Sequence, residues 1–120
     1  MVADIQSVKA FSTKTGQESW NYKNTFRVAP HGANTAVSTF EDYVILTSWI
    51  DNTLKIMKPE SGEILGSLED LNVPVSATKF KDSIAVALDG DGTITLFNFD
   101  NKKPIILASG FLAPTHVINY

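Results

Sequence analysis

Two aspartates separated by one glycine, Asp89 and Asp91 in "DGDGT" (89–93), have a spacing that suits a metal ion. Carboxylates two residues apart can share a hard cation such as calcium, whose ligands are oxygen atoms. The full calcium-binding loop is incomplete, because no Glu follows at the required distance. A hairpin turn explains the same residues, since Asp and Gly tolerate the backbone of tight turns. The turn is the preferred interpretation, and calcium at Asp89 and Asp91 is the alternative.

The two histidines, His31 and His116, could act as a general base near neutral pH. They stand at different points of the internal repeat described below, because His116 aligns with Ala36 and Ser76. Nothing in the sequence therefore brings them together, and polar loop residues are the preferred interpretation.

Trp20 and Trp49 could stack on a ligand. Trp20 lies inside a strand pattern and is expected to pack between layers of the fold. Trp49 follows the apolar run "YVILTS" (43–48) and is expected to be the more exposed of the two.

Composition excludes several classes of function. Cysteine is absent, which excludes disulfides and thiolate chemistry, and neither a Gly-x-Ser-x-Gly elbow nor a phosphate-binding glycine loop occurs. The net charge is −3 and the Lys and Arg residues are scattered singly, so nucleic acid is not expected as a partner. No membrane span is expected, and the opening "MVADIQ" lacks the features of a signal peptide, so the compartment is not assigned.

The elements that would position these residues form an internal repeat. The segments "HGANTAVSTF" (31–40), "LNVPVSATKF" (71–80) and "FLAPTHVINY" (111–120) follow one another at a spacing of 40 residues. The register continues without a gap from 41–57 to 81–97, and the opening "SVKAFSTKTG" (7–16) matches "TLKIMKPESG" (53–62) at a spacing of 46. The chain therefore repeats one structural unit.

Each unit holds four short strands joined by turn residues. The third unit shows them as "NVPVSATKF" (72–80), "DSIAVALD" (82–89), "TITLFNF" (93–99) and "KPIILAS" (103–109), rich in β-branched and aromatic residues. The second strand is a nearly continuous apolar run, which indicates burial on both faces of the sheet. Four antiparallel strands repeated every 40 residues, with a doubly buried strand, predict blades of an all-β β-propeller. A β-sandwich or an up-and-down barrel is the structural alternative.

The blade boundaries follow from this register. Residues 1–30 are expected to form a partial blade, 31–70 and 71–110 one blade each, and 111–120 the first strand of a further blade, all within a single propeller segment. The end blades then leave apolar sheet faces to be covered. Either a longer propeller or association into a homo-oligomer would cover them.

The stretch "VKAFSTKTGQESWNY" (8–22) resembles the pyrroloquinoline-quinone-type propeller repeat, in which a strand, a Thr-Gly turn and a Trp recur. The stretch "TLKIMKPESGEIL" (53–65) is similar but lacks the Trp, since position 66 is Gly. The stretch "ILASGFLAPTHV" (106–117) resembles the blade junctions of six-bladed lactonase-like and NHL-like propellers. These resemblances imply a propeller and carry over no catalytic residue.

A binding or scaffold module is the function that these observations favour, with part of a lactonase-like or quinoprotein-like propeller enzyme as the alternative. In a propeller, the connections between blades and the turns after the second strands share one face, on which function is expected. The partner would be a protein or a small ligand on that face. The candidate binding residues are Arg27, His31, Trp49, Asp51 and His116. No cofactor and no catalytic residue is predicted, and calcium at Asp89 and Asp91 is the metal hypothesis.

Overall fold

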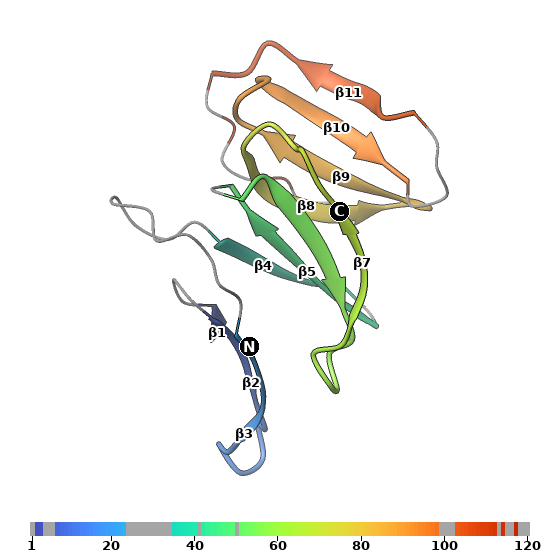
Figure 1. Cartoon of the computed structure of the whole chain (residues 1–120). Coiled ribbons are helices and arrows are strands. Elements are labelled where there is room, and N and C mark those ends of the chain that lie inside the picture. The colour runs from blue at the N-terminus through green and yellow to red at the C-terminus, as the bar shows by residue number, and fades with distance from the viewer. Residues whose placement is uncertain are drawn as a thin grey trace.

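The computed structural model describes residues 2–3, 7–23, 35–40, 42–49, 51–98, 103–112, 114 and 117. This part of the chain contains β-strands and no helix, as the sequence predicts, and so has no helix that could span a bilayer. The strands form three separate antiparallel sheets rather than one closed barrel (Figure 1).

Each sheet is a meander in which strands that follow one another in sequence are hydrogen-bonded neighbours. The first sheet has the order β1 (Val2–Ala3), β2 (Ser7–Phe11), β3 (Glu18–Lys23). The second has the order β4 (Thr35–Phe40), β5 (Tyr43–Ser48), β6 (Thr53–Met57), β7 (Ile64–Leu68). The third has the order β8 (Pro74–Phe80), β9 (Ser83–Leu88), β10 (Thr93–Phe97), β11 (Ile105–Ser109).

The two sequence registers are confirmed as structural repeats. Strand β9 starts 40 residues after β5 (83 against 43), and β10 starts 40 residues after β6 (93 against 53). The spacing of 46 residues relates the turn that contains Gly16 to the turn that contains Gly62, and both turns have the same conformation. Gly16 donates its N–H to the carbonyl of Ser12 at 2.8 Å, and Gly62 donates to that of Lys58 at 2.9 Å. Both glycines have positive φ, 71° and 72°, which explains why glycine recurs there.

The core lies between the sheets, because strand β5 is buried on both of its faces. Val44 and Leu46 point toward the first sheet and form a cluster with Met57, against which Trp20 and Tyr22 pack. On the opposite face, Ile45 belongs to a second cluster with Leu54 of the same sheet and three side chains of β9. Those three are Ile84, Val86 and Leu88.

The alternating faces of β9 show the same double burial in the third sheet. Val86 is fully buried in the cluster against the second sheet, and Ala85 and Ala87, on the other face, are 2% and 0% exposed. On that far side the Val117 N–H donates to the hydroxyl of Ser76, whose strand pairs with β9 next to Ala87. Full burial of one Val or Leu side chain stabilises a fold by about 1.5–3 kcal/mol. The paired clusters are therefore the main source of stability in the described part of the chain.

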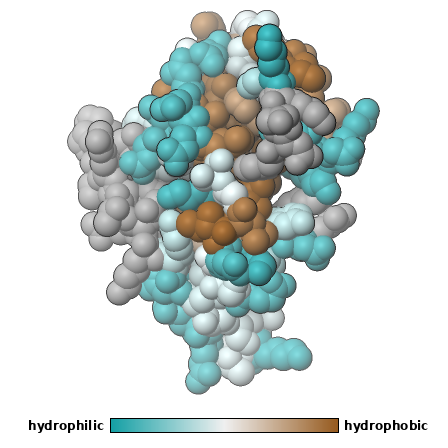
Figure 2. All heavy atoms as spheres, turned by 45° about the vertical axis from the view of Figure 1, so that its right-hand side comes forward, coloured by the Kyte–Doolittle hydropathy of each residue, from teal (hydrophilic) through white to brown (hydrophobic). Residues whose placement is uncertain are grey.

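In the second and third sheets, exposed apolar side chains are concentrated on the last strand. Ile105 and Ile106 of β11 are 62% and 64% exposed, and Ile64 and Leu65 of β7 are also exposed. Figure 2, which brings the β7 side of Figure 1 forward, shows hydrophobic surface framed by hydrophilic residues. Strands β7 and β11 are thus the outer edges of their sheets.

Trp20 joins the first sheet to the second, as the sequence predicts for its side chain. Its indole N–H donates to the carbonyl of Pro59 at 2.6 Å, in the turn between β6 and β7. The ring lies so close to Gly62 that a Cβ there would be 2.8 Å from the ring carbon Cε3. Glycine at position 62 is therefore required twice, by its positive φ and by the indole.

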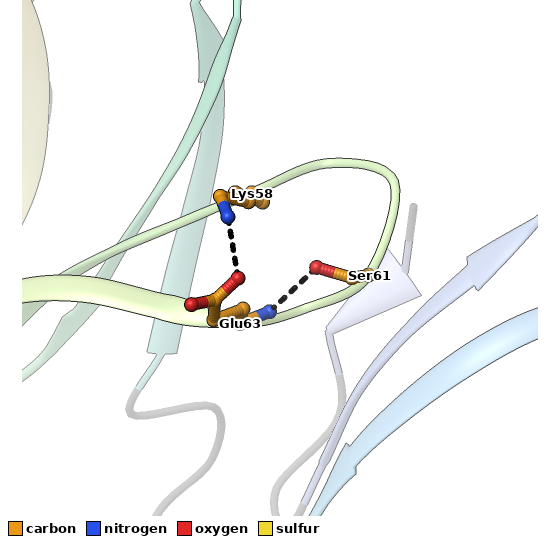
Figure 3. A network of polar contacts seen from close by, with 3 residues as sticks. All are labelled: Lys58, Ser61 and Glu63. Carbon is orange, nitrogen blue, oxygen red and sulfur yellow. Dashed lines mark hydrogen bonds and ion pairs between the residues drawn. The ribbon is translucent and has the colours of Figure 1, made fainter.

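Polar contacts fix the shape of the turn that receives Trp20. Lys58 and Glu63 form an exposed ion pair at 2.5 Å, and the Glu63 N–H donates to the Ser61 hydroxyl (Figure 3). The hydrogen bond to Glu63, together with the negative charge of its carboxylate, raises the pKa of Lys58 above its ordinary value. Two backbone hydrogen bonds between Lys58 and residues 62 and 63 complete the turn.

The double requirement on Gly62 gives a prediction with a matched control. Gly16→Ala tests the positive φ alone, because nothing lies within 4 Å of a Cβ at position 16. We expect it to cost about 1–2 kcal/mol of the free energy of unfolding. Gly62→Ala should cost about 1–3 kcal/mol more, because its methyl group overlaps the Trp20 ring. Urea denaturation of both variants measures the difference, and equal losses would show that the indole does not pack on this turn.

Candidate functional site

The candidate site is the end of the sheets at which the connections between sheets meet the turns inside them. We call it the loop end and define it by the described residues 49, 51–52, 69–73, 89–92 and 110–112. It lies at the upper left of the second and third sheets in Figure 1. The sequence predicts that these connections and turns share one face, and the hydrogen bonds between them confirm it.

The connection between β7 and β8 is fixed to the turn that follows β5. The Leu71 N–H donates to the carbonyl of Asn52 at 2.9 Å, and the Val73 N–H donates to the Asn52 side-chain oxygen at 3.3 Å. Asn52 has a φ of 56°, a conformation that Asn adopts more readily than most residues. One asparagine thus holds two backbone donors of the neighbouring connection.

The same connection is also fixed to the turn that follows β9. The Asp89 N–H donates to the Val73 carbonyl at 2.9 Å, and the Gly90 N–H donates to the Asn72 carbonyl at 3.2 Å. The Asn72 side-chain amide donates to a carboxylate oxygen of Asp91 at 2.6 Å. The loop end is consequently one hydrogen-bonded unit that spans two sheets.

Val73 carries backbone strain at the centre of this unit. Its φ is 57°, which is an outlier for a β-branched side chain. Such conformations cost on the order of 1–3 kcal/mol and persist only where the surrounding structure fixes them. Here the N–H and the carbonyl of Val73 are both hydrogen-bonded to neighbouring turns, so its conformation is imposed.

Three of the five binding residues proposed from sequence, Arg27, His31 and His116, lie outside the described residues. Trp49 and Asp51 are half-buried on the loop end. The Asp51 carboxylate accepts a hydrogen bond from the Ser48 hydroxyl at 2.9 Å, and that hydroxyl oxygen accepts the Asp51 N–H at 3.4 Å. Asp51 therefore closes its own turn, and ligand binding by these five residues stays a prediction.

Sequence reasoning missed the two most exposed apolar residues of the loop end. Leu112 is 98% exposed and Phe111 is 44% exposed, in the connection that follows β11. The Phe111 N–H donates to the Gly92 carbonyl at 3.1 Å, which attaches this connection to the turn after β9. The signal was present as "GFLAP" (110–114), where two large apolar residues interrupt a turn-like segment.

The charge of the loop end has one sign. Its described residues contain five acidic side chains and no Lys, Arg or His: Asp51, Glu69, Asp70, Asp89 and Asp91. Apart from the half-buried Asp51, all of them are exposed. Exposed apolar side chains therefore stand beside an acidic surface held on rigid backbone.

Asp89 and Asp91 are also the predicted metal ligands. The described residues contain no group of three or more His, Cys, Asp or Glu side chains that could hold a metal ion. Asp91 already accepts a hydrogen bond from the Asn72 side-chain amide. The two exposed carboxylates of Asp89 and Asp91 are few ligands for calcium, which takes about 6–8 oxygen atoms. The calcium hypothesis stays a prediction.

A direct test uses the wild-type chain and the Asp89→Asn and Asp91→Asn variants. We expect millimolar calcium to leave the melting temperature of all three unchanged, because a solvated turn explains both aspartates. A calcium-dependent rise in the wild type that both variants lose would establish the metal site instead.

No family model matches this chain, and no curated protein matches it by sequence. Among solved structures, the chain is similar to BamB from Moraxella catarrhalis, with a TM-score of 0.65 and 21% sequence identity. The match covers 100% of this chain and 36% of the BamB chain, so the chain spans about a third of the length of that protein. BamB is a β-propeller, and the likeness, together with the stacked four-stranded sheets, confirms the predicted β-propeller fold.

Proposed function

We propose that this chain is a propeller segment that works as a binding or scaffold module and uses the loop end to contact a polypeptide partner. The observation that carries the proposal is the pair Phe111 and Leu112, exposed on a hydrogen-bonded loop system with acidic neighbours. Exposed large apolar side chains beside polar residues are typical of interaction sites.

The chemistry of the loop end specifies the partner. Leu112 offers an apolar anchor, and anchors of this kind contribute most where they become fully buried at an interface. The acidic residues would attract Lys and Arg side chains and speed the encounter. Because the loops are already fixed by hydrogen bonds, little conformational entropy is lost on binding. The partner is therefore a segment that combines basic and apolar residues.

We further propose the blade boundaries of the sequence analysis, with 31–70 and 71–110 as blades, 1–30 as a partial blade and 111–120 as the start of another. The face of the third sheet that points away from the second sheet supports the presence of a neighbour packed against it. Ile94, Leu96 and Ile105 share its face away from the second sheet, and Ile105 is 62% exposed. A further blade of a longer propeller or a second copy of this chain would cover that face.

Of the two propeller families that the sequence resembles, we propose the quinoprotein-like one, since BamB has repeats of that type.

Peptide binding tests the role of the loop end. The probe is a fluorescent peptide that alternates Lys with Leu or Phe, and its control has Glu in place of every Lys. We expect fluorescence anisotropy to show binding of the basic peptide alone, with an affinity that falls as salt rises. Leu112→Ser should weaken it at least about tenfold, a loss of about 1.4 kcal/mol.

Two matched variants separate the loop end from the general surface. Ile106→Ser removes another exposed apolar side chain, from β11 and outside the loop end, and the variant should bind the peptide as the wild type does. Glu69→Gln combined with Asp70→Asn should weaken binding, whereas Glu60→Gln in the turn before β7 should not. Equal binding of both peptides, or no loss in Leu112→Ser, would contradict the proposal.

A further inference from the structure

A pocket of about 330 Å³ lies between the second and third sheets, away from the loop end. Its apolar lining comes from the second sheet and from the start of β9: Tyr43, Ile45, Ile56, Leu65 and Ile84. Gly66 of β7 contributes backbone, and Lys79, Asp82 and Ser83 supply polar groups. This volume is at the lower end of the range of small-molecule sites, which is about 300–1,000 Å³.

The junction between the first and second sheets shows what the space between two sheets can hold. In the first sheet Ala10 pairs with Trp20, and in the second sheet Ile56 pairs with Gly66. In both sheets the register shifts directly after this pair, so Trp20 and Gly66 occupy equivalent positions. Trp20 fills its junction with an indole ring, whose N–H is bonded to the Pro59 carbonyl.

At the junction between the second and third sheets, the position equivalent to Trp20 is Gly66, which has no side chain. Its partner Ile56 packs against the cluster between the second and third sheets, so a side chain at position 66 would point into the same interface. Gly66 lies within strand β7 and lines the pocket. The pocket is therefore bounded by the glycine that stands where the first sheet has its indole.

We propose that this pocket binds a free planar aromatic molecule with the size of an indole ring. The apolar walls would bury the two faces of the ring, and Tyr43 adds an aromatic wall. The Ser83 hydroxyl and the Asp82 carboxylate are acceptors for a ring N–H, the part that the Pro59 carbonyl plays for Trp20. This site is separate from the loop end and does not depend on the function proposed for it.

Indole itself is the probe, followed by NMR of the methyl groups. We expect saturable shifts of Ile45, Ile56 and Ile84 with a dissociation constant on the order of 1 mM or tighter. Val44 and Leu46, on the opposite face of β5, should not move, which makes them the internal control. Shifts that are absent, or that spread over both faces of β5, would overturn the proposal.

Gly66→Trp places the missing indole in the chain. We expect it to fill the pocket, raise the melting temperature and weaken indole binding at least about tenfold. Ile106→Trp, which adds an indole at an exposed position of β11 outside the pocket, should bind indole as the wild type does. Unchanged binding in a folded Gly66→Trp chain would place the site elsewhere.

A short peptide with a central Trp distinguishes the source of the ring. We expect it to bind more weakly than indole, because the flanking peptide backbone and side chains lose conformational freedom on binding. Binding of the peptide without binding of indole would overturn the free-molecule proposal in favour of a protein-borne Trp.

Discussion

Strands β5 and β9 carry buried side chains on both faces of their sheets, so each sheet needs a packed layer on either side. For β5 the layers are the first and third sheets, with one apolar cluster on each face. For β9 they are the second sheet and the side on which Val117 is bonded to Ser76. Stacking repeated blades face to face satisfies this requirement, and the exposed outer strands β7 and β11 follow from it.

The two junctions between sheets meet the same requirement in different ways. Trp20 supplies one large ring to the first junction, and Gly62 makes room for it in the receiving turn. At the second junction Gly66 supplies no side chain, and a pocket remains beside aliphatic residues. A single residue type at one strand position thus decides whether a junction between blades is filled or open.

Strands and turns could be predicted from the sequence because local patterns determine them. The apolar runs 43–48 and 83–88 and the glycines at 16 and 62 each have a physical reason visible in the letters. For the loop end, the sequence predicts only that the connections between sheets and the turns inside them share one face. The side-chain bonds of Asn52 and Asn72 join segments some 20 residues apart, and the strained φ of Val73 depends on them. No periodicity encodes such contacts, and the exposure of Leu112 depends on where the whole connection lies.

Native-state hydrogen exchange tests the central claim, that doubly buried strands hold the blades together. We expect the amides of β5 and β9 to exchange slowest and to open together, because both strands are paired on two edges and covered on two faces. The amides of β7 and β11, at the exposed edges, should exchange faster by orders of magnitude. Equal protection of β9 and β11, or rapid exchange in β5, would contradict the stacked-blade account.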